Sequence, residues 1–361
     1  HCVAVSGNTV MTHLLLGISP ESIGQLPFRP VANSYSEYRA RDLQLGIHSL
    51  GIVDVIPSVS GYVGGDIVSD IYVARLSDRG DPTLLVDIGT NGEIVYAEGG
   101  QYIACATAAG PAFEGYGTAH GCRAATGAIE HIDFGASLKS ETFETRVIGG
   151  GPATGLCGSA LIDFIACGMR SGLINRVGRF NIERLRDAGR HLRIEEMCGV
   201  VHACVVVPAE QSGNGEAIYV SEADVAQILK AKAAIYAGMK TLLGVRKKSL
   251  ADISRFCLAG GFARHIHLQN AILIGLLPDI PLDRFDVIGN GSLAGAMLAL
   301  VDADAMDAYQ TIAKQPEVVE LNCVASFENN FIDALALPNL NAAEFPNVTA
   351  EIAAALSEPP S

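Results

Sequence analysis

The sequence lacks tryptophan, an excess of positive charge and any long apolar run. No apolar run reaches the roughly 18 residues needed to span a bilayer, and nothing at the start resembles a signal peptide. With 25 Lys and Arg against 39 Asp and Glu, the net charge is −14. This sign argues against non-specific binding to nucleic acid and to anionic membrane surfaces. We therefore expect a cytoplasmic protein with neither nucleic acid nor membrane as a partner.

Metal-binding cysteine motifs are also missing. The chain contains nine cysteines, but no CxxC pair and no zinc or iron–sulfur ligand spacing. Most of them lie in apolar surroundings, which favours free, buried thiols in a reducing compartment. A thiol cluster assembled only by the fold remains an alternative. The cysteines are Cys2, Cys105, Cys122, Cys157, Cys167, Cys198, Cys204, Cys257 and Cys323.

Glycine and apolar residues, by contrast, are abundant. The chain has 361 residues, of which 49% are hydrophobic and 39 are glycine. This length predicts two domains or lobes with large cores and many tight turns. The polar segment 78–82 is the best boundary between them.

Short strands alternate with helices along most of the chain. We expect strands at residues 3–5, 52–56, 84–86, 93–96, 101–106, 256–259, 286–288 and 318–321. We expect helices at residues 10–16, 35–45, 67–76, 155–172, 222–243, 267–274, 293–301 and 327–335. Residues 107–131 favour a close-packed loop with a short helix, 176–215 an insertion with a hairpin at 200–207, and the C-terminal end a frayed segment. The pattern is typical of the α/β class.

The stretch LLVDIGTNGEIV at 84–95 is the most informative in the chain. It predicts a hairpin whose first strand ends in Asp87 and whose turn exposes backbone N–H groups to an anion. Asp87 beside such a turn suits a hydrated Mg²⁺ that bridges to phosphate oxygens. The alternative is a structural turn in which Asp87 only caps its own backbone.

Glycine-rich turns follow several other strands. They lie at Gly7, at 61–65, at Gly260-Gly261 and at 289–291. In an open α/β sheet, ligands bind where such strands end. An ordinary strand–helix connection is the alternative reading for the first of them.

These turns resemble those of the actin-like ATPase superfamily, and the closest resemblance is to one of its families, the reductive activators of corrinoid proteins. The resemblance is carried by motifs in the family's order, from residue 6 to residue 296. They are SGNTVMTHLLLG (6–17), LPFRPV (26–31), PSVSGYVGGDI (57–67), LLVDIGTNGEIV (84–95), TAAGPAFEG (107–115), GLCGSALID (155–163), LAGGFARHIHLQNAILIGLLPD (258–279) and GNGSLAGA (289–296).

The resemblance implies an actin-like (ASKHA) fold of two ribonuclease-H-like lobes with ATP and Mg²⁺ in the cleft. Residues 1–80 would belong to an incomplete first lobe and 81–301 to the second, with an inserted region at 107–215 and an extension at 302–361. Asp87 would bind the metal, and Asp66 resembles the acidic residue near the attacking water. The remaining nucleotide-binding candidates are Gly7, Asn8, Thr9, Gly64, Gly65, Gly89, Thr90, Asn91, Gly92, Glu114, Lys232, Gly260, Gly261 and Ser292.

Two features of the family's full pattern are missing. There is no ferredoxin-type cysteine set for a [2Fe-2S] cluster, and no upstream DxGTTT phosphate loop. Val10, Ala160 and Ala263 are smaller departures. We therefore expect this chain to be the C-terminal portion of a longer protein, with the [2Fe-2S] domain outside it.

The family resemblance implies ATP hydrolysis coupled to reduction of a corrinoid protein from Co(II) to Co(I). The partners would be the corrinoid protein of a methyltransferase system, an electron donor acting through the ferredoxin-like domain, and a second copy of the chain in a homodimer. One alternative is a small-molecule kinase on the same fold, with Asp66 or Glu114 as general base. Another is a non-catalytic module gated by nucleotide.

Overall fold

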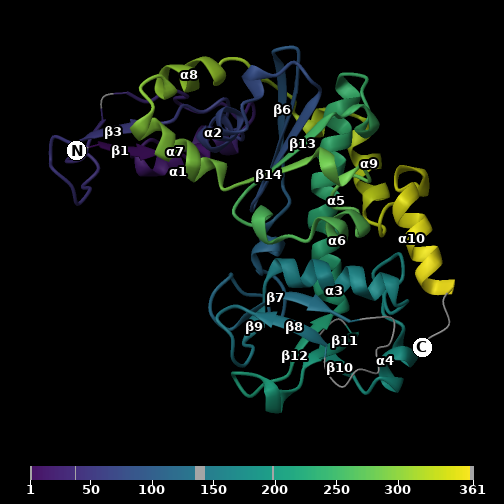
Figure 1. The fold of residues 1–361 in the computed structure, drawn as a ribbon. Coiled ribbons are helices and arrows are strands. Elements are labelled where there is room, and N and C mark those ends of the chain that lie inside the picture. The colour runs from purple at the N-terminus through teal and green to yellow at the C-terminus, as the bar shows by residue number, and fades with distance from the viewer. Residues whose placement is uncertain (1, 37, 135–142, 197–198, 358–361) are drawn as a thin grey trace.

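The computed structural model describes residues 2–36, 38–134, 143–196 and 199–357. Within them, the strands form one six-stranded sheet and three three-stranded sheets, surrounded by helices (Figure 1). No helix in this part of the chain is both long and apolar enough to cross a bilayer. The six-stranded sheet is the centre of the molecule.

The central sheet has the strand order β14-β13-β4-β5-β6-β15. Strands β4, β5 and β6 form an antiparallel meander, and β13 and β14 continue the sheet in parallel with β4. The predicted hairpin at 84–95 is therefore confirmed. The strand bounds are β4 Thr83–Ile88, β5 Gly92–Glu98, β6 Gln101–Thr107, β13 Arg255–Ala259, β14 Phe285–Gly289 and β15 Glu317–Val318.

Strand alternation sends the side chains of β4 into two separate cores. Leu84 and Val86 belong to the large core that contains α5 (Glu222–Val245), whereas Leu85 belongs to the core that contains α2 (Gly65–Val73). Asp87 lies two residues beyond Leu85. The period of two therefore directs its carboxyl towards α2.

Helix α5 confirms the prediction for residues 222–243. The Ser221 hydroxyl accepts from the backbone N–H of Asp224, and the Asp224 carboxylate accepts from the backbone of Ser221. This reciprocal cap fixes where the helix begins. Figure 1 shows α5 and α9 (Ser326–Ala334) on one side of the central sheet and α2 with α8 (Ala305–Ile312) on the other.

The N-terminal sheet has the order β1-β3-β2. Its elements are β1 Cys2–Val5, α1 Thr9–Leu15, β2 Tyr38–Arg39 and β3 Ile52–Val55. The predicted helix at 35–45 is wrong. Tyr38 and Arg39 pair with β3, the Ala40 N–H donates to Gly51, and Gln44 takes a left-handed conformation. Tertiary pairing overrides the helical pattern there.

Helix α7 (Gly291–Val301) packs directly on α2. A Cβ built on Gly291 would lie 1.9 Å from a carboxyl oxygen of Asp70, and one on Gly295 would lie 2.4 Å from the Cβ of Ser69. Only glycine permits so close an approach at these two positions. The backbone of α7 thus contacts side chains of α2, although the two helices are more than 200 positions apart in the sequence.

The region between β6 and α5 forms two small sheets and two helices, below the central sheet in Figure 1. The loop predicted at 107–131 is only partly correct, because residues from Ala128 onwards pair as a regular strand. The hairpin predicted at 200–207 is wrong, because these residues form one strand paired on both sides. The bounds are β7 Ala128–Asp133, β8 Glu144–Val147, β9 Gly155–Leu156, α3 Gly158–Arg170, α4 Ile182–Asp187, β10 His191–Glu196, β11 Gly199–Val207 and β12 Ile218–Ser221.

The predicted frayed end is also wrong up to residue 357. Pro346–Ser357 form helix α10, whose buried Val348 joins the large core; residues 358–361 lie outside the described part of the chain. Helix α6 (Leu268–Leu273) is found where a helix is predicted.

Candidate functional site

Four carboxyls meet where the α2 core ends at the central sheet. Asp66 and Asp70 lie one turn apart on α2, so they share a face of that helix. Asp87 is the last residue but one of β4, and Glu93 lies directly opposite it on β5. One helix and two strands thus bring their acids to one place.

The electrostatics of this acidic cluster (Asp66, Asp70, Asp87 and Glu93) are unfavourable without a cation. Burial, followed by the charge of Asp87, raises the pKa of Asp66 to about 6. Burial and then Asp87 raise the pKa of Asp70 well above its ordinary value, and burial and then Asp66 do the same for the pKa of Glu93. Burial also raises the pKa of Asp87. These are the shifts expected when carboxylates are desolvated together.

Asp70 supplies the most direct sign of a missing partner. Both of its carboxyl oxygens are buried and accept from no N–H or hydroxyl donor, and the one side chain that shares a hydrogen bond with Asp70 is another carboxyl, that of Asp87. An unsatisfied buried carboxyl is rare and costly. Its oxygens and the neighbouring Asp87 fit a hard cation such as Mg²⁺.

The cluster does not form a complete metal cage. Among the described residues, no three His, Cys, Asp or Glu side chains are arranged to hold an ion by themselves. Mg²⁺ commonly takes only one or two carboxylates and fills its other positions with water and phosphate oxygens. The site therefore fits a cation that arrives with a phosphate ligand.

The backbone beside the acidic cluster is open to such a ligand at three glycines. A Cβ on Gly7 or Gly261 would meet nothing within 4 Å, and one on Gly89 only Asn91 O at 3.7 Å. Gly260 differs, because its φ is +100° and a Cβ there would lie 2.5 Å from Ile88 O. Its missing side chain lets the turn after β13 lie against the end of β4.

The hairpin turn is braced by its own contacts. The Gly89 N–H donates to Asn91 O at 3.0 Å, and the Thr90 hydroxyl donates to the carboxylate of Glu114. Glu114 belongs to the short 3₁₀ helix Pro111–Glu114. Gly92 is buried, and a Cβ there would lie 2.7 Å from the Thr107 hydroxyl, so it serves packing and does not face the cleft.

The first-lobe candidates hold two turns together. The Asn8 side chain accepts from Val10 N–H and caps α1, while the buried Thr9 hydroxyl donates to Ser60 O at 2.6 Å. Gly7 O accepts from Gly65 N–H at 3.0 Å. A Cβ on Gly64 would lie 2.8 Å from the Cα of Asn8. Of the three glycines in this group, Gly7 is the one with open space where a side chain would be.

Ser292 belongs to a chain of hydroxyls between α7, β1 and α2. Its Oγ donates to Ser6 Oγ at 2.9 Å, and Ser6 Oγ lies 2.8 Å from Ser69 Oγ. Ser69 in turn donates to Gly65 O at 2.8 Å. The contacts of Ser292 fix the joint between the helices beside the acidic cluster.

The structure does not bring Lys232 to this site. Its side chain is fully buried in α5, and Nζ donates to Ala336 O at 2.6 Å and Pro338 O at 2.7 Å. Burial lowers the pKa of Lys232 well below its ordinary value. These contacts give it a role in anchoring residues 336–338.

A cavity of about 190 Å³ lies beside Gly261. Glu114, Gly261 and Phe262 line it, together with the thiols of Cys122 and Cys157. Phe262 stacks on Phe113 with ring centroids 5.6 Å apart. This flat, partly apolar wall next to open backbone is suited to a nucleoside base.

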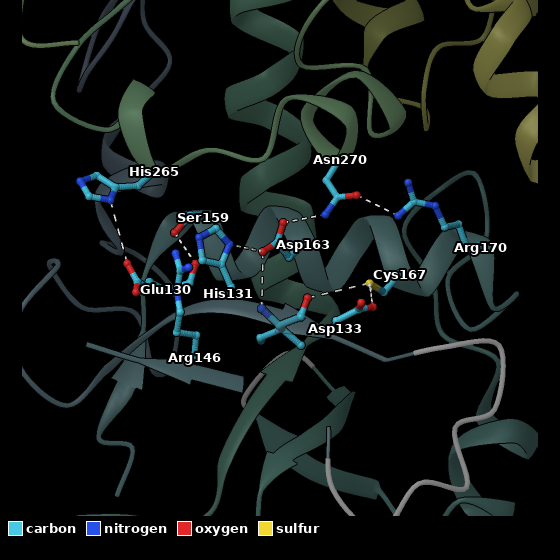
Figure 2. A network of polar contacts seen from close by, with 11 residues as sticks. Glu130, His131, Asp133, Arg146, Ser159, Asp163, Cys167, Arg170, His265 and Asn270 are labelled. Atoms are coloured by element: carbon cyan, nitrogen blue, oxygen red, sulfur yellow. Dashed lines mark hydrogen bonds and ion pairs between the residues drawn. The ribbon is translucent and has the colours of Figure 1, made fainter. Parts of the chain in front are cut away.

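A second polar network joins side chains of α3 to residues of the segments beside it (Figure 2). His131 Nδ1 lies 2.9 Å from Asp163 Oδ2, Asn270 donates to Asp163 Oδ1 at 2.7 Å, and Arg170 donates to Asn270 at 2.8 Å. These side chains line a cavity of about 530 Å³, larger than the one beside Gly261. The motifs did not single out this network.

The sequence reading also missed Asp70, Glu93 and the thiol pair as parts of the site. Asp70 follows Asp66 at the i, i+4 spacing, and Glu93 faces Asp87 across a short turn. Both positions follow from helix and hairpin geometry. The proximity of Cys122 to Cys157 has no comparable signal, because their closeness depends on the folding of the region between them.

Comparisons with known proteins match these features over most of the chain. Residues 81–349 match the family described as the C-terminal domain of RACo, the ASKHA domain, and residues 1–79 match the RACo middle region. A solved structure titled reductive activator for corrinoid, iron–sulfur protein superposes with a TM-score of 0.88 at 37% identity, covering 96% of this chain and 54% of that one. The predicted actin-like fold is confirmed.

Two curated proteins are similar as well. The corrinoid activation enzyme RamQ of Eubacterium limosum is 32% identical over 90% of this chain and 54% of its own length. The Co(II) methylated amine-specific corrinoid protein reductase of Methanosarcina barkeri is 24% identical over 72% of this chain and 46% of its own. The chain thus spans about half the length of the curated relatives it matches.

Proposed function

The chain belongs to the RACo family of reductive activators of corrinoid proteins, and on that premise we propose that it binds and hydrolyses ATP to drive reduction of a corrinoid protein from Co(II) to Co(I). The relatives are named for corrinoid activation and corrinoid protein reduction. An iron–sulfur domain outside these residues would supply the electron.

The observation that carries the proposal is the acidic cluster beside open glycine backbone. Four desolvated carboxyls with raised pKa values favour a bound cation, and the Asp70 carboxyl, which accepts from no N–H or hydroxyl donor, lies among them. The N–H groups beside Gly89 and Gly261 can approach phosphate oxygens without obstruction. This combination supports binding of a magnesium nucleotide.

Each residue then has a definite task. Asp87 and Asp70 would hold Mg²⁺, which when bound neutralises phosphate charge. Asp66, with a pKa of about 6, can accept a proton from the attacking water. Thr90 and Glu114 fix the turn that presents Gly89, and Phe262 covers the base. We expect the packing contact between α2 and α7 to change when the nucleotide-binding residues close on nucleotide.

Coupling to the corrinoid protein requires that nucleotide change its affinity for one cobalt state. A ligand shifts an equilibrium only by its differential affinity for the two states. Closure of the lobes around nucleotide would supply the two states. The corrinoid partner, the electron donor and assembly as a homodimer all belong to this proposal.

The test uses the full-length protein and compares ATP hydrolysis with and without a Co(II) corrinoid protein. We expect stimulation by the corrinoid partner, and a fall in kcat on the order of 100-fold for Asp87→Asn. Asp283→Asn changes an exposed carboxylate elsewhere and serves as the matched control. Absence of stimulation by every such partner would contradict the coupling.

The raised pKa of Asp66 also supports a second candidate, a small-molecule kinase. A carboxylate with a pKa of about 6 is a suitable general base for a substrate hydroxyl. Glu114 is the weaker base candidate, because Thr90 already donates to it. Phosphorylation of acetate, glycerol or a sugar by the full-length protein would establish the kinase; ATP turnover without any phosphorylated product would exclude it.

A further inference from the structure

Cys122 and Cys157 lie on two segments that run side by side. Gly121 and Leu156 form a parallel bridge, and the Cys122 N–H donates to Leu156 O at 2.9 Å. The next residues along both segments are the two cysteines. A Cβ built on Gly155 would lie 2.7 Å from Cys122 Sγ, so this sulfur points across towards the second segment.

Cys122 and Cys157 line the same wall of the cavity beside Gly261, and the thiol of Cys157 acts on the pKa of Cys122. Neighbouring strands are about 4.8 Å apart, which falls inside the Cα separation of roughly 4.4 to 6.8 Å found in disulfides. Both cysteines are free in the structure. A bond between them therefore requires no large movement of the backbone.

The two sulfurs differ in reactivity. Cys122 is partly exposed, whereas Cys157 is 5% exposed. The hydrogen bond from Cys157 lowers the pKa of Cys122 to about 7, so roughly half of it is thiolate at neutral pH. The contact with Cys122 raises the pKa of Cys157. Cys122 is thus suited to attack an oxidant and Cys157 to resolve the product.

We propose that Cys122 and Cys157 are an oxidation site that closes to a disulfide with peroxides and that this disulfide and a bound nucleotide exclude each other. The first half of the proposal stands on the geometry of the pair alone. The second half rests on the proposed nucleotide site.

The reaction balances with one peroxide. The Cys122 thiolate attacks a peroxide oxygen, the O–O bond breaks, and Cys122 sulfenic acid forms while the other oxygen leaves as alcohol or water. The Cys157 sulfur then attacks the sulfenic sulfur, the S–S bond forms, and water leaves with the Cys157 proton. The two sulfurs lose two electrons in total, and the peroxide gains them.

The position of the pair connects this reaction to the nucleotide pocket. Cys157 precedes the first residue of α3, Gly158, whose Cβ would lie 2.0 Å from Phe113 O. The Cys122 backbone packs equally closely on Gly115, just after Glu114. A disulfide would draw the two sulfurs to about 2.05 Å and tie both packed segments together beside Phe262. Conversely, a nucleotide base bound against this cavity wall would shield Cys122 from peroxide.

The first experiment treats the reduced full-length protein with hydrogen peroxide and follows each cysteine by mass spectrometry. The lowered pKa of Cys122 raises its thiolate fraction at pH 7, so we expect it to react faster than the exposed control Cys323. The product should be the Cys122–Cys157 disulfide. Cys157→Ala should instead accumulate sulfenic acid at Cys122.

The second experiment adds magnesium ATP or ADP during oxidation, and measures nucleotide affinity of the reduced and oxidised forms. We expect at least tenfold slower oxidation of Cys122 with nucleotide present, and at least tenfold weaker binding by the disulfide form, restored by dithiothreitol. Cys323→Ser should leave both readouts unchanged.

Each outcome of these experiments tests a separate part of the proposal. Failure to form the Cys122–Cys157 disulfide while Cys323 reacts would overturn the oxidation site. A disulfide form that binds nucleotide as tightly as the reduced form would overturn the exclusion. Absence of nucleotide binding by the reduced protein would count against the proposed function, and the mass readout would still decide on the thiol pair.

Discussion

Helices α2 and α7 both follow a short strand and a glycine-containing turn, and they pack against each other. Most of α2 is buried, including Ser69 and Asp70, whereas α7 buries only Gly291 and Gly295. The outer face of α7 leaves Met297 61% exposed and Val301 80% exposed. The two helices therefore have different roles. Helix α2 contributes the carboxyls and core side chains, and α7 contributes a flat glycine face against which α2 packs.

This division explains how the carboxyls of α2 come to be desolvated. Gly291 and Gly295, at i and i+4 on α7, place no Cβ against Asp70 and Ser69, so the α7 backbone lies directly on these two residues. Without that approach, water would reach the acidic cluster and its pKa shifts would shrink. Four changes test whether α2 and α7 differ in this way.

The largest effect should come from filling the glycine face. Gly295→Leu places a side chain where Ser69 lies 2.4 Å from the new Cβ, and we expect a loss of roughly 3 kcal/mol or more in the free energy of unfolding. Chemical denaturation measures it. Gly244→Ala in α5, where a Cβ meets nothing within 4 Å, is the matched control and should be neutral or stabilising. Equal losses for both would contradict the close approach.

The pH dependence of stability should come next. The folded pKa of Asp66, about 6, lies above its ordinary value of 3.8. The contribution of Asp66 to the free energy of unfolding is therefore fully present below pH 3.8 and is lost as the pH rises through 6. Without magnesium nucleotide, this loss amounts to at most about 3 kcal/mol. Denaturation across this range should show a flatter profile for Asp66→Asn, while Asp283→Asn keeps the wild-type slope. An unchanged profile for Asp66→Asn would contradict the raised pKa of this partly buried carboxyl.

Breaking the hydroxyl chain should have a smaller effect. Ser6→Ala removes the group that joins Ser292 to Ser69, and we expect a loss of about 1 kcal/mol, since Ser69 keeps its bond to Gly65. Thermal unfolding of the variant measures it. Ser357→Ala, at the exposed end of α10, is the control and should change stability by less. A neutral Ser6→Ala would mean that the chain does not stabilise the joint.

The smallest effect should follow a change on the outer face of α7. Met297→Gln alters a side chain that is 61% exposed, and we expect less than about 0.5 kcal/mol in unfolding free energy. A loss comparable with that of Gly295→Leu would show that this face is covered in solution.

The acidic cluster also shows how far the sequence could lead. The hairpin follows from its Gly-Thr-Asn-Gly turn and from alternation, and α5 from its cap and periodicity. Both signals are local and both are confirmed. Asp66 and Asp87 were predicted through motifs, whereas Asp70 was not singled out. Its importance depends on Gly291, about 220 positions away, which no local pattern includes.

The wrong predictions have related causes. The helix at 35–45 had suitable spacing, but Tyr38 and Arg39 pair with a strand that begins at Ile52. Lys232 on α5 has the spacing of a polar face, yet the carbonyls of Ala336 and Pro338 enclose its ammonium. In both cases the deciding contact is remote in sequence.

The anchoring of Lys232 has a consequence for the order of events during synthesis. Its second carbonyl partner, Pro338 O, lies 106 residues further along the chain. A ribosome adding about 5 to 20 residues per second needs on the order of 5 to 20 s to reach it. Until then the ammonium has water as its best partner, so this side of α5 stays open after the central strands have been made. The packing around Lys232 is complete only when residues 336–338 have been made.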